Sequence, residues 1–220
     1  VGGLAPKGIC GSGILDLIAE GFLSGWIDSA GNLQKSASPC IRDVWDDTRQ
    51  RNVPAIIYAY DGNVPLYFTQ DDIGEFLTCK AAAYTMVATL LESVNVSPSE
   101  IGAFYLAGGF GTHYDLESAI TVGLYPDLPR EKFKILGNSS LAGAKRLLLD
   151  TGCRARLDQI RALATYVQFG EMEKFVENMQ AARFLPHTDA SRYPSVMRRL
   201  RERGKTFPPG KLAAERSGAD

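Results

Sequence analysis

Three short segments combine glycine with small polar residues, as phosphate- and nucleotide-binding loops do. They are Gly11-Ser12-Gly13, Gly108-Gly109-Phe110-Gly111 and Gly137-Asn138-Ser139-Ser140. Because glycine has no Cβ, a ligand can approach the backbone closely at such positions. Where a helix begins directly after the loop, its free amide groups and its dipole favour a negatively charged ligand. Simple turns before helices have the same composition, so each segment by itself leaves both interpretations open.

Predicted strands precede the two later glycine segments, and predicted helices follow them. Residues 104–107 and 133–136 are apolar runs of strand length, whereas residues 115–120 and 141–149 have helical patterns. Two strand–loop–helix units in succession indicate parallel strands joined by right-handed crossovers. We therefore expect residues 102–149 to form two parallel strands whose glycine loops lie at one carboxyl edge, where such sheets bind ligands.

A hairpin and a long helix are the other elements that the pattern specifies. Residues 53–60 and 64–68 are β-branched and aromatic runs on either side of Asp61-Gly62-Asn63, which is a strong hairpin signal. Residues 69–93 carry one apolar stripe and begin with the Thr-x-x-Asp spacing of a capping box.

Lys80 lies at the border of the apolar stripe of this long helix. One interpretation is a lysine whose methylene stem covers apolar surface while its charge stays in water. The other interpretation is a lysine that faces a ligand cleft and contacts a nucleotide. The residues alone leave both open.

The remaining segments are less regular. Residues 14–22 have an amphipathic helical pattern, for which Ser12 is the expected N-cap. Residues 28–52 are polar and are predicted to be irregular. We expect their acidic and basic side chains to pair on a solvated surface instead of holding a metal. Residues 164–169 are predicted to be a strand. The helix predicted after it has a face made by Met172, Phe175, Val176 and Met179.

Composition and charge narrow the class of protein. The 220 residues are 45% hydrophobic and 22% charged, as in soluble globular proteins. A formal net charge of −1 argues against a nucleic-acid binder. No apolar run could span a membrane and no signal peptide is visible, so the cytoplasm is the expected location. The four cysteines are too far apart to predict a zinc site or an iron–sulfur cluster. They are Cys10, Cys40, Cys79 and Cys153.

Both ends of the chain carry information. The sequence begins at Val1 within a glycine-rich run, so we expect a piece of a longer protein or a processed chain. From Thr188 the composition becomes basic and ends in glycine, proline and small residues, which predicts a partly helical, solvated tail. The expected division is a folded region at 1–187 and a basic tail at 188–220. Docking of an acidic partner is an alternative role for the tail.

Several segments together resemble one protein family. Residues 106–111, Leu-Ala-Gly-Gly-Phe-Gly, are similar to the adenosine motif of the superfamily that contains acetate and sugar kinases, heat-shock chaperones and actin. Residues 137–144 are similar to the helix that follows this motif. More narrowly, the chain resembles the reductive activators of corrinoid proteins from about residue 7 to about residue 186. The segments that carry this narrower resemblance are 8–13, 68–73, 80–82 and 123–127 together with the two motifs above.

The resemblance implies an α/β fold, namely an actin-like (ribonuclease H-like) ATPase subdomain with a mixed sheet and flanking helices, plus a small hairpin-and-helix subdomain. It implies ATP and Mg²⁺ in a cleft between two actin-like domains, of which this chain supplies the adenosine side. No Asp-x-Gly-Thr phosphate loop precedes Gly108, so no catalytic residue is assigned and the chain alone is expected to be inactive. The implied nucleotide contacts are Gly11, Ser12, Gly13, Lys80, Gly108, Gly109, Phe110, Gly111, Gly137 and Asn138.

For the full-length parent, the resemblance implies ATP-dependent reduction of a cobalt(II) corrinoid protein to cobalt(I) in a methyltransferase system such as O-demethylation. An iron–sulfur domain outside this chain would deliver the electron. ATP binding and hydrolysis would change the affinity for the corrinoid partner. The resemblance also favours a homodimer. Two other classes stay open, a non-catalytic partner-binding module of the same fold and a small-molecule kinase of the same superfamily.

Overall fold

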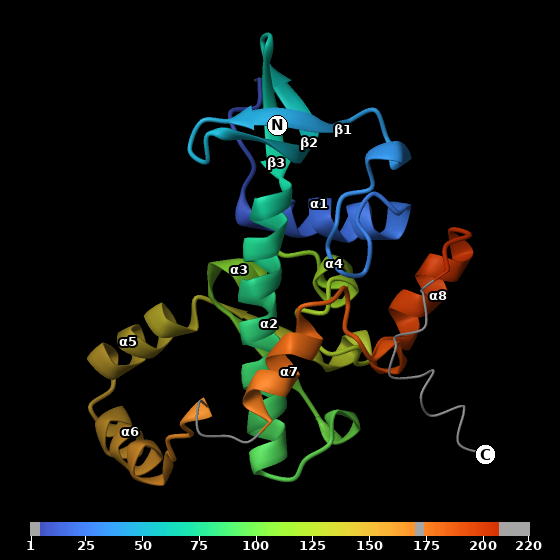
Figure 1. Ribbon diagram of the computed structural model, residues 1–220. Coiled ribbons are helices and arrows are strands. Elements are labelled where there is room, and N and C mark those ends of the chain that lie inside the picture. Colours follow the sequence, from blue (N-terminus) through green and yellow to red (C-terminus); the bar gives the residue numbers. More distant parts are fainter. Residues whose placement is uncertain (1–4, 170–173, 207–220) are drawn as a thin grey trace, which may run out of the picture.

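The computed structural model describes residues 5–169 and 174–206 (Figure 1). A three-stranded antiparallel sheet lies at the amino-terminal end of the long helix α2, and a two-stranded parallel sheet lies farther along it. In chain order the helices and strands are α1 (Gly11–Ser24), β1 (Ile41–Asp46), β2 (Arg51–Asp61), β3 (Val64–Thr69), α2 (Gln70–Ser93), β4 (Phe104–Ala107), α3 (Gly108–His113), α4 (Leu116–Thr121), β5 (Phe133–Gly137), α5 (Ser139–Leu149), α6 (Gly152–Leu163), α7 (Phe175–Ala182) and α8 (Pro194–Glu202). Short 3₁₀ turns lie at Lys35–Ala37, Pro98–Glu100, Arg130–Lys132 and Ala190–Arg192.

The antiparallel sheet contains the predicted hairpin and one strand that the sequence did not predict. β2 and β3 pair as expected across the turn at Gly62, which has a positive φ of 59°. The prediction of irregular structure at 28–52 was wrong for residues 41–46, which pair with β2 from Ile41–Ile56 to Asp46–Arg51. Charged residues interrupt the apolar alternation of this strand, and its stability comes from hydrogen bonding to β2.

Helix α2 follows β3 directly and begins as the sequence predicts. Thr69 accepts a hydrogen bond from the Asp72 amide at 3.1 Å, and the Thr69 amide donates to the Asp72 carboxylate at 2.9 Å. This reciprocal capping box satisfies two amides that the first turn leaves without intrahelical partners. The predicted apolar stripe is buried along Ile73, Leu77 and Ala81, which pack in the central core.

The two later strands are parallel, which confirms the central fold prediction. Phe104 pairs with Phe133 at the beginning of the ladder, and Ala107 pairs with Gly137 at its end. α3 (Gly108–His113) begins immediately after β4, so the loop predicted at 108–111 is wrong and the helix predicted from 115 is the separate helix α4. α5 begins two residues after β5. Both glycine segments therefore leave the sheet at the same carboxyl edge.

Helix α1 is present, but Ser12 is not its N-cap. Gly11 is already helical, and the Cys10 carbonyl oxygen accepts the first helical hydrogen bond from the Ile14 amide at 2.9 Å. Cys10 is therefore the N-cap residue, and its side chain makes no capping hydrogen bond. The small glycine residues let the helix begin two residues earlier than the hydroxyl of Ser12 indicated.

The strand predicted at 164–169 is not formed by residues 164–168, which have no regular structure. Val167 and its neighbours have strand-like side chains, but the described part of the chain provides no partner strand for them. Met172, which was predicted to lie on the following helix, falls outside the described residues. The helix itself is α7, and it begins at Phe175.

The segment after Thr188 is more buried than predicted. Tyr193, Val196 and Leu200 are at most 4% exposed and belong to the central core. The prediction of a solvated tail was therefore wrong for this segment, because the many arginines of α8 hide an apolar face that packs inward. The division between 187 and 188 stays a prediction, and residues 207–220 lie outside the described part.

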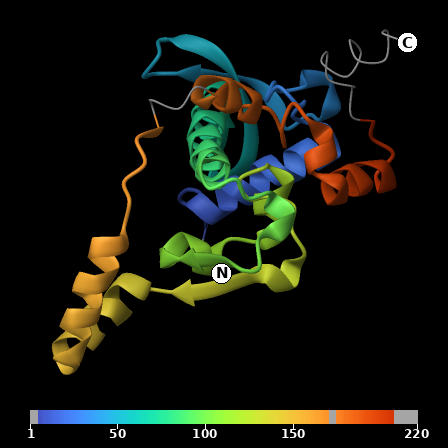
Figure 2. The ribbon, with the colours of Figure 1, turned by 90° about the horizontal axis from the view of Figure 1, so that it is seen from below.

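Helices α5 and α6 project from the rest of the molecule as an arm (Figures 1 and 2). Neither helix contains a buried residue. Leu148, Leu149 and Leu163 are 85%, 73% and 83% exposed. Within the described residues, none of the helices combines the length and the hydropathy that crossing a bilayer requires.

Candidate functional site

Gly108 and Gly137 mark the carboxyl edge of the parallel sheet. Their φ angles are 89° and 64°, a left-handed region that residues with a side chain rarely adopt. A Cβ built on either glycine meets no atom within 4 Å. Backbone conformation thus favours glycine at both positions, and the space beside them is open to a ligand.

Gly109 and Gly111 lie in α3 but serve different purposes. A Cβ on Gly109 also meets nothing within 4 Å, and its φ is not positive, so only an incoming ligand would be affected by a side chain there. A Cβ on Gly111 would lie 3.1 Å from Leu106 Cβ and 3.2 Å from its carbonyl carbon, so this glycine serves packing. Phe110 belongs to α3, and its side chain is outside the described part.

Asn138 follows Gly137 and fixes the start of α5. Its side-chain oxygen accepts a hydrogen bond from the Leu141 amide at 2.9 Å. Within α3, Thr112 Oγ1 donates to the Gly108 carbonyl oxygen at 3.0 Å. These local hydrogen bonds hold both glycine segments in place, and the amide groups at the start of α5 remain directed toward the carboxyl edge.

The third glycine segment lies on the same side of the molecule. α1 packs against α4 and contacts α3, and two views at right angles place its amino-terminal end beside α3 (Figures 1 and 2). Cys10 Sγ lies 3.1 Å from Ser12 Oγ, and this hydrogen bond lowers the pKa of the thiol. A Cβ on Gly13 would lie 2.8 Å from Ile9 Cγ1, so Gly13 serves packing.

Lys80 does not lie in water. The residue is 1% exposed, and its Nζ donates to the main-chain carbonyl oxygens of Ala182, Phe184 and Pro186. The interpretation of a lysine with a solvated charge was therefore wrong. In this arrangement, all three ammonium hydrogens of Lys80 have main-chain carbonyl acceptors. The contact between Lys80 and a nucleotide stays a prediction.

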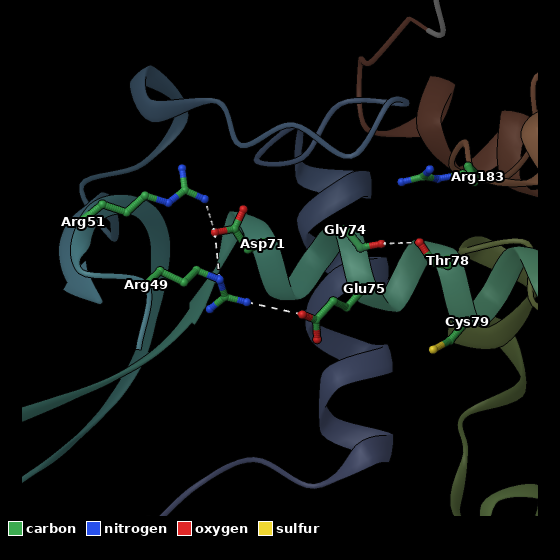
Figure 3. Close-up of a pocket in the computed structure, with 8 residues that line it drawn as sticks. All are labelled: Arg49, Arg51, Asp71, Gly74, Glu75, Thr78, Cys79 and Arg183. Atoms are coloured by element: carbon green, nitrogen blue, oxygen red, sulfur yellow. Dashed lines mark hydrogen bonds and ion pairs between the residues drawn. The ribbon is translucent and has the colours of Figure 1, made fainter. Parts of the chain in front are cut away.

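A charged groove of about 610 Å³ lies between the start of β2 and the first turns of α2 (Figure 3). Arg49 contacts Asp46 at 2.8 Å, Asp71 at 3.2 Å and Glu75 at 3.3 Å, and Arg51 contacts Asp71 at 2.6 Å. The acids and bases of this region pair with one another, as expected from their interspersed order. The groove is therefore a weaker candidate for an anionic ligand than the glycine edge.

A cavity of about 750 Å³ lies beside the loops that lead into β4 and β5. Its wall includes Tyr84 and Leu91 of α2, the loops at 95–98 and 124–128, and Arg192. Arg192 donates to the Tyr84 hydroxyl at 2.8 Å. This cavity is separate from the glycine segments, which leave the opposite ends of the same strands.

Sequence reasoning missed the role of Asp127. Its carboxylate accepts hydrogen bonds from the Ser195 amide and hydroxyl, both at 2.7 Å, and from Arg130 at 2.8 Å. A Cβ on nearby Gly123 would lie 2.0 Å from the Pro186 carbonyl oxygen. The segment at 123–127 therefore docks the region around Pro186 and Ser195. Its partners are far away in the sequence, and only the resemblance of this segment to a family motif singled it out.

Known proteins match most of this chain. A family model described as the C-terminal domain of RACo, the ASKHA domain, matches residues 1–197. The corrinoid activation enzyme RamQ of Eubacterium limosum is 30% identical over 183 residues, which are 80% of this chain and 31% of that protein. A solved reductive activator for corrinoid, iron-sulfur protein matches with a TM-score of 0.78 and 34% identity over 88% of this chain and 31% of that one. The chain spans about a third of the length of these relatives.

Proposed function

This chain belongs to the family of RACo C-terminal ASKHA domains, and from this premise we propose that it forms the adenosine side of the ATP-binding domain in a reductive activator of corrinoid proteins. The actin-like α/β fold and the family agree with the expectation from the glycine motifs. The names of RamQ and of the solved activator both refer to corrinoid, and we therefore propose a corrinoid protein as the partner.

The observation that carries the proposal is the pair of adjacent glycine segments at one carboxyl edge. Gly108 and Gly137 take conformations that favour glycine, and a Cβ at Gly108, Gly109 or Gly137 would point into open space. A nucleotide fits such an edge, because its adenosine can lie against bare backbone while helix amides favour the phosphate side.

The magnesium ion of ATP has no cluster of protein ligands in the described part of the chain. Within the described residues, no group of three His, Cys, Asp or Glu side chains could hold a metal ion. The ion would be held by the ATP phosphates and by residues outside this chain. The same holds for the iron–sulfur cluster, which we assign to another part of the parent protein.

We infer that the surface around the glycine edge is completed by the rest of the parent. The arm of α5 and α6 exposes Leu148, Leu149 and Leu163, and apolar surface of this kind marks a place where other protein packs. The relatives are about three times as long as this chain. The chain alone therefore presents one side of a nucleotide cleft and is expected to be inactive.

In the full-length parent, an iron–sulfur cluster outside this chain would supply the one electron that reduces cobalt(II) of the corrinoid substrate to cobalt(I). ATP contributes free energy when its bound and hydrolysed states differ in affinity for the corrinoid protein. The protein then favours the geometry of electron transfer in one nucleotide state and releases its partner in the other. A cytoplasmic homodimer that serves a methyl-transfer system, such as O-demethylation, remains part of the proposal.

The test uses the full-length parent, a corrinoid protein and a chemical reductant of the iron–sulfur domain. The absorbance of the corrinoid reports the conversion of cobalt(II) to cobalt(I). We expect this conversion to require ATP and to stop when ATP is replaced by a non-hydrolysable analogue. Equal reduction with and without ATP would contradict the proposal. Phosphorylation of a small molecule in place of corrinoid reduction would favour the kinase alternative.

A further inference from the structure

The Lys80 ammonium group is enclosed by main-chain carbonyl groups. Its Nζ donates to the carbonyl oxygens of Ala182, Phe184 and Pro186, the last two at 2.7 Å. These acceptors are alternate residues that run from the last residue of α7, Ala182, into the segment between α7 and α8. Lys80 comes from the middle of α2, about a hundred residues earlier in the chain. A primary ammonium has three hydrogens and no lone pair, so three acceptors match its bonding capacity.

In the described part of the chain, no acidic side chain partners the charge in this enclosure. Within residues 5–169 and 174–206, no carboxylate lies within ion-pair distance of Lys80. Burial lowers the pKa of Lys80 from 10.5 to about 7. The charges that act on neighbouring His187 are Lys80, Arg192 and Asp189. A buried charge without a counter-ion is costly unless it is fully hydrogen-bonded. The three carbonyl dipoles therefore carry the stabilisation, as rings of carbonyl oxygens do around monovalent cations.

The enclosed segment contacts two other elements of the fold. The Leu185 amide donates to the Ser29 carbonyl oxygen at 2.7 Å, just beyond α1. The Pro186 carbonyl group packs against Gly123, just beyond α4. A cation at this place thus joins α2 to the segment that borders α1 and α4.

We propose that the carbonyl oxygens of Ala182, Phe184 and Pro186 form a binding site for a primary ammonium ion, which Lys80 fills as a tethered ligand. The site is a structural one that ties α2 to the segment at 182–186. A neutral amine fits it poorly, because one of the three carbonyl oxygens would face the nitrogen lone pair. The site therefore selects a cation with three N–H donors, and any such ion of the right size can replace the side chain.

The test truncates the Lys80 side chain by substitution and supplies the missing ammonium group as a dissolved ion. In Lys80→Ala, the missing atoms are three methylenes and the ammonium group, which n-propylammonium supplies. We expect the substitution to lower the melting temperature of the 220-residue chain by on the order of 10 °C. n-Propylammonium should restore part of this loss with a saturating concentration dependence. Tetramethylammonium, which has the charge but no N–H donor, should restore none. Lys145→Ala, at an exposed position of α5, is the matched control and should melt like the wild type.

Two outcomes overturn the proposal. One is a Lys80→Ala variant that melts like Lys145→Ala. The other is equal recovery with n-propylammonium and tetramethylammonium, since the carbonyl oxygens would then not recognise N–H donors. If Lys80→Ala does not fold, nuclear magnetic resonance of the wild type with isotope-labelled lysine side-chain nitrogen decides. An ammonium signal of Lys80 that exchanges with water more slowly than that of Lys145 supports the site, and equal exchange contradicts it.

Discussion

Ala107 pairs with Gly137 across the parallel strands β4 and β5, so the two glycine segments leave the sheet as direct neighbours. Residues that are 30 positions apart in the sequence thereby form one edge. The segments differ in detail, since Gly108 opens α3 directly whereas Asn138 caps α5 after Gly137. This shared edge is the basis of the proposed nucleotide site, and it makes the individual glycines separately testable.

Gly108→Ala should lower the free energy of unfolding by about 1–2 kcal/mol, because an alanine must adopt the left-handed backbone of this position. Gly109→Ala is the matched control. Its Cβ meets no atom and its φ is not positive, so stability should stay the same or rise slightly. Chemical denaturation of both variants measures the difference. Equal stability of the two variants would show that Gly108 is free to change its backbone conformation.

Leu200→Ala should lower the free energy of unfolding by about 2–5 kcal/mol, because Leu200 is 4% exposed in the central core. Arg201→Ala, one position along the same helix and exposed, should change it by less than about 0.5 kcal/mol. Urea denaturation compares the two. If Leu200→Ala were as stable as Arg201→Ala, the segment after Thr188 would be the solvated tail that its composition indicates.

His187 should make the protein less stable in acid. Burial, helped by the charges of Arg192 and Lys80, lowers the pKa of this imidazole from 6.5 to about 4. Its Nδ1 also accepts a hydrogen bond from the Asp189 amide at 2.9 Å, which requires the neutral ring. Between these two pKa values the unfolded chain binds a proton that the folded chain does not. The free energy of unfolding therefore falls as the pH drops from about 6.5 to about 4, by up to about 3 kcal/mol.

The His187→Asn variant tests whether His187 causes this loss of stability in acid. The asparagine side-chain oxygen can accept the same hydrogen bond and does not titrate. Unfolding free energies measured from pH 7 to pH 4 should fall less steeply for this variant than for the wild type. Parallel curves would assign the acid sensitivity to other groups.

Local patterns predicted the parts of the fold that local interactions determine. The capping box at Thr69, the hairpin turn at Gly62 and the two strand–helix units all depend on neighbours within a few residues. The parallel pairing of β4 and β5 also followed from their succession in the chain, because such units join by a crossover of fixed hand.

The remaining features depend on distant partners. Residues 41–46 became a strand because β2 lies beside them, whereas residues 164–168 have strand-like side chains and no partner. The many arginines of α8 concealed Val196 and Leu200, whose burial depends on the core that they meet. The environment of Lys80 could not be predicted for the same reason, since its carbonyl acceptors come from residues 182–186.

The candidate site was predicted as a set of glycines, but their separate roles were not. Gly108 and Gly109 are equivalent in the sequence. In the structure, only Gly108 has a positive φ, while Gly111 and Gly13 have close packing neighbours. A side chain at Gly109 would therefore not strain the backbone, and any effect of such a side chain must come from the ligand.

The most direct test of the account is calorimetric titration of ATP with magnesium into the full-length parent and its Gly109→Val variant. Because Gly109 faces open space and has no conformational need for glycine, the substitution should leave the unfolding temperature nearly unchanged. It should weaken ATP binding by about 1–3 kcal/mol, or about fivefold to 150-fold, since the side chain occupies the space where the ligand meets the backbone. Equal ATP affinity of the folded variant and the wild type would contradict the assignment of this edge as the adenosine site.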